Sequence, residues 1–403
     1  MTILVLNAGS SSLKFRLFHM ETLRPLMEAE EVLAQGKVER LGTEHARLTF
    51  RESESSTPRT EEIGAVALAD AVAHLFNLLP DSVQTLDAIG HRIVHGGAQF
   101  HTPTRIAAAT LTALHALTPL APLHNPAGIA VIEAARQLRP DVPNVAVFDT
   151  AFHHDLPEIA ALYALPRELS ERLQLRRYGF HGISYRAVSE RYFAHRGVPA
   201  EGSRLILCHL GNGASVCALR DGRSVETSMG FTPLEGLIMG TRSGDIDPGL
   251  LLYLIEQNHF TVEQLANLLN HQSGLLGLSG GSSSDMRDLE TAANAGDTNA
   301  ELALACFAHR VRKYIGAYSA VLGGVDALIF TGGIGEHSAT MRARICYNLD
   351  FLGLALDPQR NADANGTEPE PIGAGDGLRV WIVPTDEERQ IARETYALLK
   401  ETQ

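Results

Sequence analysis

The chain has 403 residues, of which 45% are apolar and 20% are charged, and its formal net charge at pH 7 is −13. This composition excludes an intrinsically disordered chain, and the acidic balance argues against a general nucleic-acid binder, which needs clustered Lys and Arg to neutralise phosphates. The length exceeds that of a typical single-core domain, so we expect two lobes of roughly 150 to 200 residues.

The elements expected in chain order alternate between strands and helices. They are a hairpin over 2–18, a helix over 63–79, strands over 88–94 and 144–148, a second hairpin over 204–220, a helix over 299–322, a strand over 327–331, a strand over 380–383 and a helix over about 387–400. The alternation indicates an α/β fold, and the similar layout of the two hairpins suggests an internal duplication.

The cysteines are widely spread and form no CxxC pair, which predicts buried free thiols rather than a zinc site or a disulfide framework. They are Cys208, Cys217, Cys306 and Cys346. The sequence shows neither a secretory leader nor an apolar run of about 18 residues. We therefore expect a cytoplasmic protein without a membrane or nucleic-acid partner.

Three glycine-rich turns follow apolar strands, at 8–12, 211–215 and 332–335. Glycine allows the backbone to approach a phosphate, and successive turn amides attract negative charge. Any single turn is a weak signal, because it could serve only to reverse the chain, but the three together indicate phosphate binding more strongly. No GxxxxGK[ST] segment is present, so this is not a P-loop protein. Asn7 and Lys14 flank the first turn, where the lysine is either a phosphate ligand or a surface residue.

Two arginines lie in unusual settings, Arg92 in GHRIVHGG and Arg242 in MGTRSGDIDP. A guanidinium group can form two parallel hydrogen bonds to a carboxylate or phosphoryl group. We therefore interpret both arginines as ligand-binding residues, with structural ion pairing as the alternative.

Asp149 directly follows the strand over 144–148, where an α/β sheet gathers its ligands. It could hold Mg²⁺ or a water of its shell, or it could cap a local helix. Glu387 begins the last helix, where a carboxylate also serves as a capping group. His181 and His209 both lie beside glycines, although a single histidine is more often a core residue.

Ten segments appear in order across nearly the whole chain: NAGSSSLKF at 7–15, GHRIVHGG at 90–97, APLHNP at 121–126, FDTAFH at 148–153, RRYGFHGISY at 176–185, HLGNGAS at 209–215, MGTRSGDIDPG at 239–249, SSDMRD at 283–288, FTGGIGEHS at 330–338 and PTDEE at 384–388. Together they closely resemble the acetate kinase family, which also contains propionate and butyrate kinases.

The resemblance implies the two-lobed actin and sugar-kinase fold, which is ribonuclease H-like and has a duplicated βββαβαβα core around a central nucleotide cleft. Residues 1–150 with about 385–403 would form the acid and phosphate lobe, and residues 151–384 the nucleotide and dimer lobe. The implied activity is reversible in-line phosphoryl transfer from ATP to acetate, giving acetyl phosphate and ADP. The implied protein is a homodimer that uses Mg²⁺, or alternatively Mn²⁺.

The resemblance also implies the site residues, grouped by role. The catalytic residues would be Asp149, His181, Arg242, Arg92 and Asn212. The acid would contact Arg92, Val94, Leu123, Phe180 and Pro233. ATP would contact Lys14, Ser12, His209, Leu210, Gly211, Asn212, Gly213, Asp285, Met286, Arg287, Gly332, Gly333, Ile334 and Gly335. The metal would be held by Asn7, Glu387 and Asp149, with Ser10 on the phosphate path and His124 in a supporting place.

Two segments depart from the family pattern. His337 follows GlyIleGlyGlu where we expect Asn, which puts an adenine-side contact in doubt, and the run over 280–285 is one residue longer than expected. Neither departure touches the phosphoryl path.

A small carboxylic acid has a pKa of roughly 4 to 5, so the nucleophile is ionised at pH 7 and the reaction requires no general base. The nearest alternative is a propionate kinase, because one methylene in an apolar pocket changes binding by only about 1 to 3 kcal/mol. An ATP-regulated switch protein of the same fold is an alternative of another class, and a second anion pocket distinguishes the kinase from it. A phosphate acyltransferase is disfavoured because it needs no adenine site.

Overall fold

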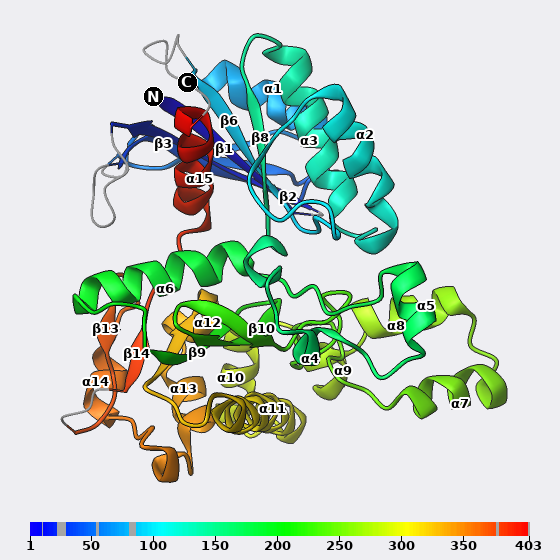
Figure 1. The fold of residues 1–403 in the computed structure, drawn as a ribbon, viewed down its shortest axis with the longest axis vertical. Helices are drawn as coiled ribbons and strands as arrows, with labels where there is room; N and C mark the ends of the chain where they lie inside the picture. The colour runs from blue at the N-terminus through cyan, green and yellow to red at the C-terminus, as the bar shows by residue number, and fades with distance from the viewer. Residues whose placement is uncertain (10, 22–29, 54–55, 80–85, 376–378, 402–403) are drawn as a thin grey trace. The chain divides into compact units, whose positions relative to one another are not determined.

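The chain forms two compact units in the computed structural model, which describes residues 1–9, 11–21, 30–53, 56–79, 86–375 and 379–401 (Figure 1). Unit 1 comprises Met1–His154, Gly182–Ala187 and Asp386–Gln403, and unit 2 comprises Asp155–His181 and Val188–Thr385. Each unit is built on one β-sheet.

The sheet of unit 1 has the strand order β5-β4-β3-β2-β1-β6-β8-β7. Its strands are β1 (Thr2–Ala8), β2 (Ser12–Met20), β3 (Glu30–Glu39), β4 (Arg47–Arg51), β5 (Arg59–Glu62), β6 (Ala88–Ile93), β7 (Thr104–Arg105) and β8 (Asn144–Phe148). Strand β1 pairs antiparallel with β2 and parallel with β6, and β6 pairs parallel with β8. The first hairpin therefore forms as the sequence predicts.

Helices cover both faces of this sheet. They are α1 (Leu68–Leu78), α2 (Ala108–Ala116), α3 (Asn125–Leu138) and α15 (Glu387–Glu401), with short 3₁₀ turns at Thr118–Leu120 and Ala151–His153. Helices α1 and α3 lie on one face and α15 on the other (Figure 1).

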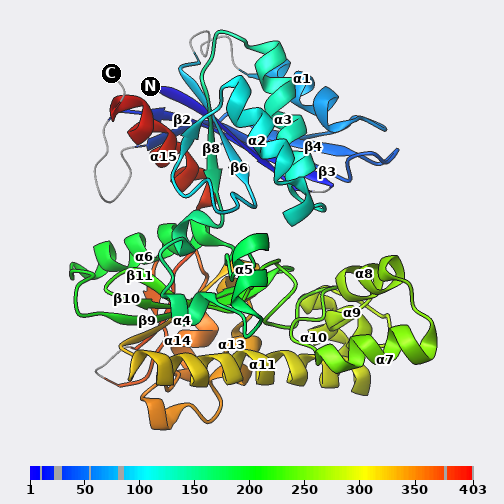
Figure 2. The same cartoon turned by 45° about the vertical axis from the view of Figure 1, so that its right-hand side comes forward.

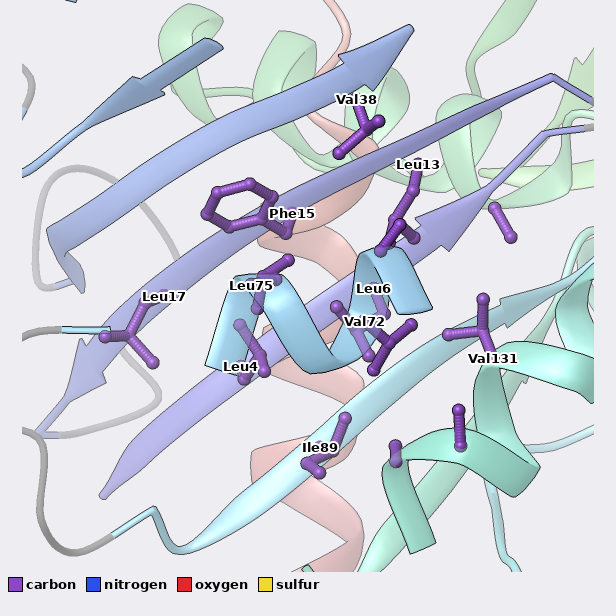
Figure 3. Close-up of a cluster of buried hydrophobic side chains, with 14 of the residues drawn as sticks. Leu4, Leu6, Leu13, Phe15, Leu17, Val38, Val72, Leu75, Ile89 and Val131 are labelled. Carbon is purple, nitrogen blue, oxygen red and sulfur yellow. The ribbon is translucent and has the colours of Figure 1, made fainter. Parts of the chain in front are cut away.

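Alternation along β1 explains how one strand serves two cores. Leu4 and Leu6 lie on the face of the sheet that α1 covers, where they pack with Val72 and Leu75 of that helix, as Figure 3 shows. The intervening side chains, such as Val5, pack on the opposite face in the cluster that contains residues of α15. Because successive strand side chains alternate between faces, a strand covered on both sides is apolar at every position, as the run TILVL is.

The sheet of unit 2 has the order β11-β10-β9-β12-β14-β13. Its strands are β9 (Arg204–Leu210), β10 (Ala214–Arg220), β11 (Arg223–Thr227), β12 (Ala327–Thr331), β13 (Glu370–Pro371) and β14 (Val380–Ile382). Strand β9 pairs antiparallel with β10 and parallel with β12, and β12 pairs parallel with β14. This arrangement repeats β3-β2-β1-β6-β8 of unit 1, so the expected duplicated α/β fold is confirmed.

Most of the remaining helices belong to unit 2. They are α4 (Glu158–Ala161), α5 (Arg167–Leu173), α6 (Gly182–Arg196), α7 (Pro248–Asn258), α8 (Val262–His271), α9 (Gly274–Leu278), α10 (Met286–Asn294), α11 (Thr298–Leu322), α12 (Gly332–His337), α13 (Ala339–Cys346) and α14 (Pro358–Asp363), with a 3₁₀ turn at Asp350–Leu352. Helix α6 begins in unit 1 and continues in unit 2. The long α11 runs beneath the sheet of unit 2 (Figure 2).

Several expectations need correction. The first helix begins at Leu68 rather than near residue 63. The apolar stripe of the predicted helix over 299–322 includes Val321 together with Phe307 and Tyr318, which predicts that Val321 is buried, but it is 47% exposed in α11. The glycines at 332–335 form the first turn of α12 instead of a separate loop.

Cys208, Cys217 and Cys346 are buried free thiols, as expected, whereas Cys306 is a free thiol that is partly exposed instead of buried. Across the described ranges, no helix is both long and apolar enough to span a membrane.

Candidate active site

Three predicted site residues of unit 1 project from the carboxyl ends of neighbouring parallel strands. Asn7 lies in β1, Arg92 in β6, and Asp149 directly after β8. Each lies an even number of positions from a side chain of β1, β6 or β8 that packs in the cluster with α15. Because strand side chains alternate between faces, all three point to the α15 face of the sheet. The local fold therefore gathers an amide, a guanidinium and a carboxylate beside the first turn of α15.

Arg92 and Asp149 form a nearly buried ion pair, with 19% and 1% of their side chains exposed. Arg92 donates from Nε to both carboxylate oxygens, at 3.2 and 3.1 Å, and from Nη2 to Oδ2 at 2.5 Å. Burial raises the pKa of Asp149 to about 6 against the opposing effect of Arg92, so the carboxyl is ionised at pH 7. The side chain of Asp149 caps no helix, because the 3₁₀ turn after it begins from Thr150.

Asn7 connects this pair to helix α15. Its Oδ1 accepts from Arg92 Nη1 at 3.3 Å, and its Nδ2 donates to Glu388 Oε1 at 3.0 Å. Burial opposes the charged form of Arg92, but the carboxylates of Asp149, Glu387 and Glu388 raise its pKa above the usual value. The predicted residue Glu387 therefore belongs electrostatically to this cluster, together with its neighbour Glu388.

The remaining predicted residues of unit 1 differ in exposure. Lys14 is exposed and lies opposite Asn7 in the β1–β2 pair, and Ser12 begins β2. Ser10 lies outside the described residues. Val94 is 7% exposed, whereas Leu123 is 45% exposed. His124 precedes the first residue of α3.

In unit 2, His181 lies at the start of α6 with a left-handed backbone, at φ 59° and ψ 21°. A non-glycine residue held in this region stores strain and marks a candidate functional position. Its ring stacks on that of His209 with centroids 4.2 Å apart, and its Nδ1 lies 2.8 Å from Ser215 Oγ. His209 and Ser215 are register partners in the β9–β10 pair, so they present their side chains on one face.

Arg242 lies close to the second glycine turn. A Cβ atom at Gly213 would be 2.9 Å from Arg242 Nη2 and 3.4 Å from His181 Nε2, so only glycine allows both groups to lie against the backbone there. Arg242 donates from Nη1 to the carbonyl oxygen of Pro233 at 2.6 Å. Burial lowers the pKa of Arg242 to about 10, which leaves the guanidinium charged at pH 7.

Arg242 makes no ion pair with any residue that the structure describes. Asn212, also in the turn, is exposed, and its carbonyl accepts from Gly240 N–H at 3.0 Å. The predicted residues Arg242, His181, His209 and Asn212 thus surround one glycine turn.

The glycine turns offer fewer free amides than the sequence predicts. Gly9 N–H donates to Ser12 O at 2.8 Å, and Gly211 N–H donates to Gly213 O at 3.0 Å. Gly332 N–H donates to the buried carboxylate of Glu336 at 2.8 Å. These three amides are used within their own segments, so an anion at these turns would be bound by side chains or by other backbone groups.

The predicted nucleotide residues of α10 are ordered by a local contact. Asp285 is the N-cap of α10, accepting from Arg287 N–H at 2.9 Å, and pairs with the Arg287 guanidinium at 2.7 Å. The Arg287 side chain is 88% exposed, whereas Met286 is 4% exposed. His337, the departure from the family pattern, is the last residue of α12 and is 61% exposed at its side chain.

The remaining members of the predicted set lie in unit 2. Phe180 is 2% exposed, Leu210 is the buried last residue of β9, and Gly333, Ile334 and Gly335 follow Gly332 in α12.

A dedicated metal cage is absent from the described residues, because no group of three His, Cys, Asp or Glu side chains converges there. Mg²⁺ usually binds one or two carboxylates together with waters and substrate phosphates. The oxygen atoms of Asn7, Asp149 and Glu387 fit that requirement, with the Asp149 carboxylate already engaged by Arg92.

The sequence reasoning missed Glu388 and Ser215 as partners of Asn7 and His181. The helical period of α15 could have identified Glu388, because positions 391, 392, 395 and 399 are buried and 388 falls on the same stripe. Ser215 stood within the glycine turn, but nothing local indicated which side chain it would contact.

Comparison with known proteins identifies the family. A model of the acetokinase family matches residues 2–393. The chain is 48% identical to an acetate kinase of Heliobacterium modesticaldum over 406 residues, covering 99% of this chain and 100% of that protein. It is 45% identical to an acetate kinase of Dictyoglomus turgidum over 408 residues, covering 100% and 98%.

Comparison with solved structures indicates the same family. The acetate kinase of Porphyromonas gingivalis superposes with a TM-score of 0.88 at 40% identity, covering 99% of both chains. A propionate kinase of Francisella tularensis superposes with a TM-score of 0.87 at 40% identity, covering 98% of both. The chain therefore belongs to the acetokinase family, and its activity is that of an acetate kinase.

Proposed function

We propose that phosphoryl transfer between ATP and acetate is direct and in line, with Arg242 as the main stabiliser of the group in transfer. The observation that supports this role is a partly buried guanidinium that lies on Gly213 and, within the described ranges, donates only to the Pro233 carbonyl. A buried cation without a carboxylate partner is costly, so this position favours an anionic ligand. In phosphoryl transfer, such preorganised donors supply most of the catalysis.

His181 and Asn212 would assist Arg242. His181 is oriented by Ser215 and by its stack on His209, and its Nε2 lies on the same glycine as Arg242. Neither residue has to remove a proton from the acid, because acetate is ionised at neutral pH. Their proposed role is hydrogen bonding to the phosphoryl oxygens.

Arg92 would bind the carboxylate of the acid. Its Nε and Nη2 are oriented by Asp149, while Nη1 makes the longer contact of 3.3 Å with the Asn7 amide oxygen. The apolar residues proposed for the methyl group are Val94, Leu123, Phe180 and Pro233. We propose acetate as the preferred acid. Propionate is the second candidate, because the similar Francisella tularensis structure is described as a propionate kinase.

Asn7, Asp149 and Glu387 would hold Mg²⁺, or Mn²⁺, directly or through its waters. Their support is their place at neighbouring strand ends beside the first turn of α15. Bound there, the ion would neutralise charge on the phosphates. Arg92 keeps Asp149 oriented and ionised, so this carboxylate is preorganised for such a role.

The nucleotide would be bound mainly by unit 2, through residues of the turn at 211–213, the start of α10 and the start of α12. Lys14, Ser12 and Ser10 would contribute from unit 1. We propose that unit 1 is the acid and phosphate lobe and unit 2 the nucleotide and dimer lobe, and that the enzyme works in the cytoplasm, where ATP is available.

Unit 2 also carries the surface that we propose for a homodimer. Helix α7 exposes large apolar side chains: Leu250 at 43%, Leu252 at 59%, Tyr253 at 56% and Ile255 at 41%. Large exposed apolar side chains gathered on one helix favour an interaction site, and a second copy of the chain is the partner implied by the family. Leu252→Glu should convert the dimer to a monomer in analytical ultracentrifugation, and an unchanged dimer would refute this placement.

The activity test combines acetate, ATP and Mg²⁺ and traps the acyl phosphate with hydroxylamine. We expect acetate-dependent hydroxamate matched by ADP formation, and a kcat/KM that falls from acetate to propionate to butyrate. A higher kcat/KM for propionate would overturn the proposed acid preference. Hydroxamate without stoichiometric ADP would overturn ATP as the phosphoryl donor.

A further inference from the structure

The segment that connects β11 to α7, residues 228–247, has no helix or strand, and yet every residue of it except Asp247 is buried or partly buried. Met229, Leu237 and Met239 are each 0% exposed. An irregular buried segment must have its backbone polar groups bonded by side chains or by other backbone groups. This segment also carries Arg242 and Pro233, so whatever holds it in place also positions Arg242.

Tyr163, Arg177 and Glu235 form a connected set against this segment. Tyr163 donates from Oη to Glu235 Oε2 at 2.5 Å, and Arg177 donates from Nη2 to Glu235 Oε1 at 2.7 Å. The Arg177 guanidinium also lies 5.7 Å from the centre of the Tyr163 ring. Burial and the hydrogen bond to Glu235 raise the pKa of Tyr163, so its phenol stays protonated as a donor.

Two of these side chains, Tyr163 and Arg177, also bind the backbone of residues 228–231. Phe231 N–H donates to Tyr163 Oη at 2.7 Å. Arg177 Nη1 donates to the carbonyls of Ser228 and Met229, at 3.4 and 3.2 Å. The side chains of Glu235 and Tyr163 lie directly against Gly230, where a Cβ atom would be 1.7 Å from Glu235 Oε2 and 2.1 Å from Tyr163 Oη.

The carbonyl that orients Arg242 lies between two of these anchored positions. Pro233 falls between Phe231, held by Tyr163, and Glu235, held by both partners. The following residue, Gly236, is fixed by Asp245, whose Oδ1 accepts from Gly236 N–H at 2.9 Å. Pro233 therefore lies in a short stretch that is anchored on each side.

Among the residues that the structure describes, the Arg242 guanidinium has no acceptor other than the Pro233 carbonyl that could hold it in place if that carbonyl moved. The one hydrogen bond that this guanidinium makes in the described part of the chain is to Pro233 O at 2.6 Å. A small shift in the position of that carbonyl would turn the guanidinium, and catalytic donors lose effect steeply with misplacement.

We propose that Tyr163, Arg177 and Glu235 form a latch that positions Arg242 through the Pro233 carbonyl, making them positioning residues for phosphoryl transfer. The inference rests on the proposed role of Arg242. The latch residues need not contact any substrate, because they act through the loop.

Tyr163→Phe is the sharpest test, since it removes one hydroxyl and keeps the ring. We expect kcat to fall about tenfold with the KM for ATP unchanged within about twofold, because the lost donor loosens the loop that orients Arg242. Tyr347→Phe is the matched control, as Tyr347 is 65% exposed in the same unit, and it should retain full activity. Glu235→Gln, which keeps the side-chain shape, should give a similar loss.

A double-mutant cycle separates the latch from a general structural role. In an Arg242→Lys background, Tyr163→Phe should lower kcat by less than about twofold, because the guanidinium that the latch orients is already absent. An equal loss in both backgrounds, or no loss in the wild type, would overturn the latch while leaving the role of Arg242 intact. Near-normal turnover of Arg242→Ala would instead remove the proposed role of Arg242 and the latch with it.

Discussion

Arg92 and Arg242 are both guanidinium groups withdrawn from solvent, but their surroundings are opposite. Arg92 pairs with Asp149 and has Glu387 and Glu388 nearby, so its pKa is raised. The Arg242 guanidinium donates to the Pro233 carbonyl alone among the residues that the structure describes, and burial lowers the pKa of Arg242 to about 10. The positive charge of Arg92 is neutralised by protein carboxylates, whereas that of Arg242 has no counterion among the described residues and favours an anionic ligand.

This difference indicates how the two arginines divide the work. A guanidinium that the protein has already paired is oriented and changes little when a ligand arrives. A guanidinium without a counterion gains most of its stabilisation from an anion, and gains more as negative charge develops. We therefore expect Arg242 to contribute mainly to the transition state and Arg92 to binding and orientation.

The largest expected effect is that of Arg242→Ala. Loss of this donor should lower kcat by about 10² to 10³, while the melting temperature stays the same or rises because an unpaired buried cation is removed. Steady-state kinetics and thermal unfolding measure the two quantities. Arg223→Ala, at an exposed position of β11, is the control. Near-normal turnover of Arg242→Ala would contradict the comparison.

A third buried arginine sharpens the distinction between an unpaired and a structural cation. Arg342 in α13 is 1% exposed and donates to Asn361 Oδ1 and to the carbonyls of Gly335, Glu336 and Asn361, at 2.8 to 2.9 Å. Burial lowers its pKa to about 10, as for Arg242, but its donors are satisfied by the protein.

Arg342→Ala should therefore lower the free energy of unfolding by about 3 kcal/mol, since several buried carbonyls lose their donors. Denaturant unfolding, followed beside Arg242→Ala, checks this expectation. If Arg342→Ala lowered the stability no more than Arg242→Ala, the number of protein acceptors would not be the distinguishing property.

His91 shows the other response to burial, which is to remain uncharged. It is 1% exposed, its Nε2 lies 2.7 Å from Asn144 Oδ1, and its Nδ1 has no partner among the described residues. Burial lowers the pKa of His91 to about 4, below the value of about 6.5 in an unfolded chain.

Because the unfolded chain binds the proton first, this stability is present above pH 6.5 and is lost as the pH falls toward 4. The loss should be about 2 kcal/mol between pH 6.5 and 5. His91→Gln keeps a donor for Asn144 and should remove this part of the slope when the free energy of unfolding is measured against pH. Identical slopes in both proteins would exclude His91 as the cause.

The smallest expected effect concerns the Arg92 cluster. Glu388→Gln removes a negative charge near Arg92 and weakens the acceptor of the Asn7 amide, which should cost about 1 kcal/mol, or fivefold in kcat/KM. Glu401→Gln, at the exposed end of the same helix, serves as the control. If Glu388→Gln lowered activity as much as Arg242→Ala does, the remaining carboxylates would not be sufficient to hold and neutralise Arg92.

Local sequence pattern predicted much of the fold. Strands β8 and β12 have the bounds that their apolar runs indicate, and both hairpins form around their glycine turns. These elements were predictable because backbone preference and alternation act over a few residues. The start of α1 and the exposure of Val321 were not, because they depend on where another element ends or covers a face.

The site divides in the same way. The motifs named Arg92, Asp149, His181 and Arg242, but the partners that distinguish the two arginines come from remote segments. Asp149 lies 57 positions from Arg92, and Tyr163 lies 72 positions from Glu235. No periodic signal relates residues at such separations.

The sequence by itself determined that the chain is a two-unit α/β protein of the acetokinase family, because apolar periodicity and ordered motifs are properties of contiguous residues. Only the tertiary structure decided which guanidinium is paired, which histidine stays neutral and which tyrosine holds the loop of Arg242. Those properties follow from desolvation and from hydrogen-bond partners, and both depend on the segments that folding brings around each group.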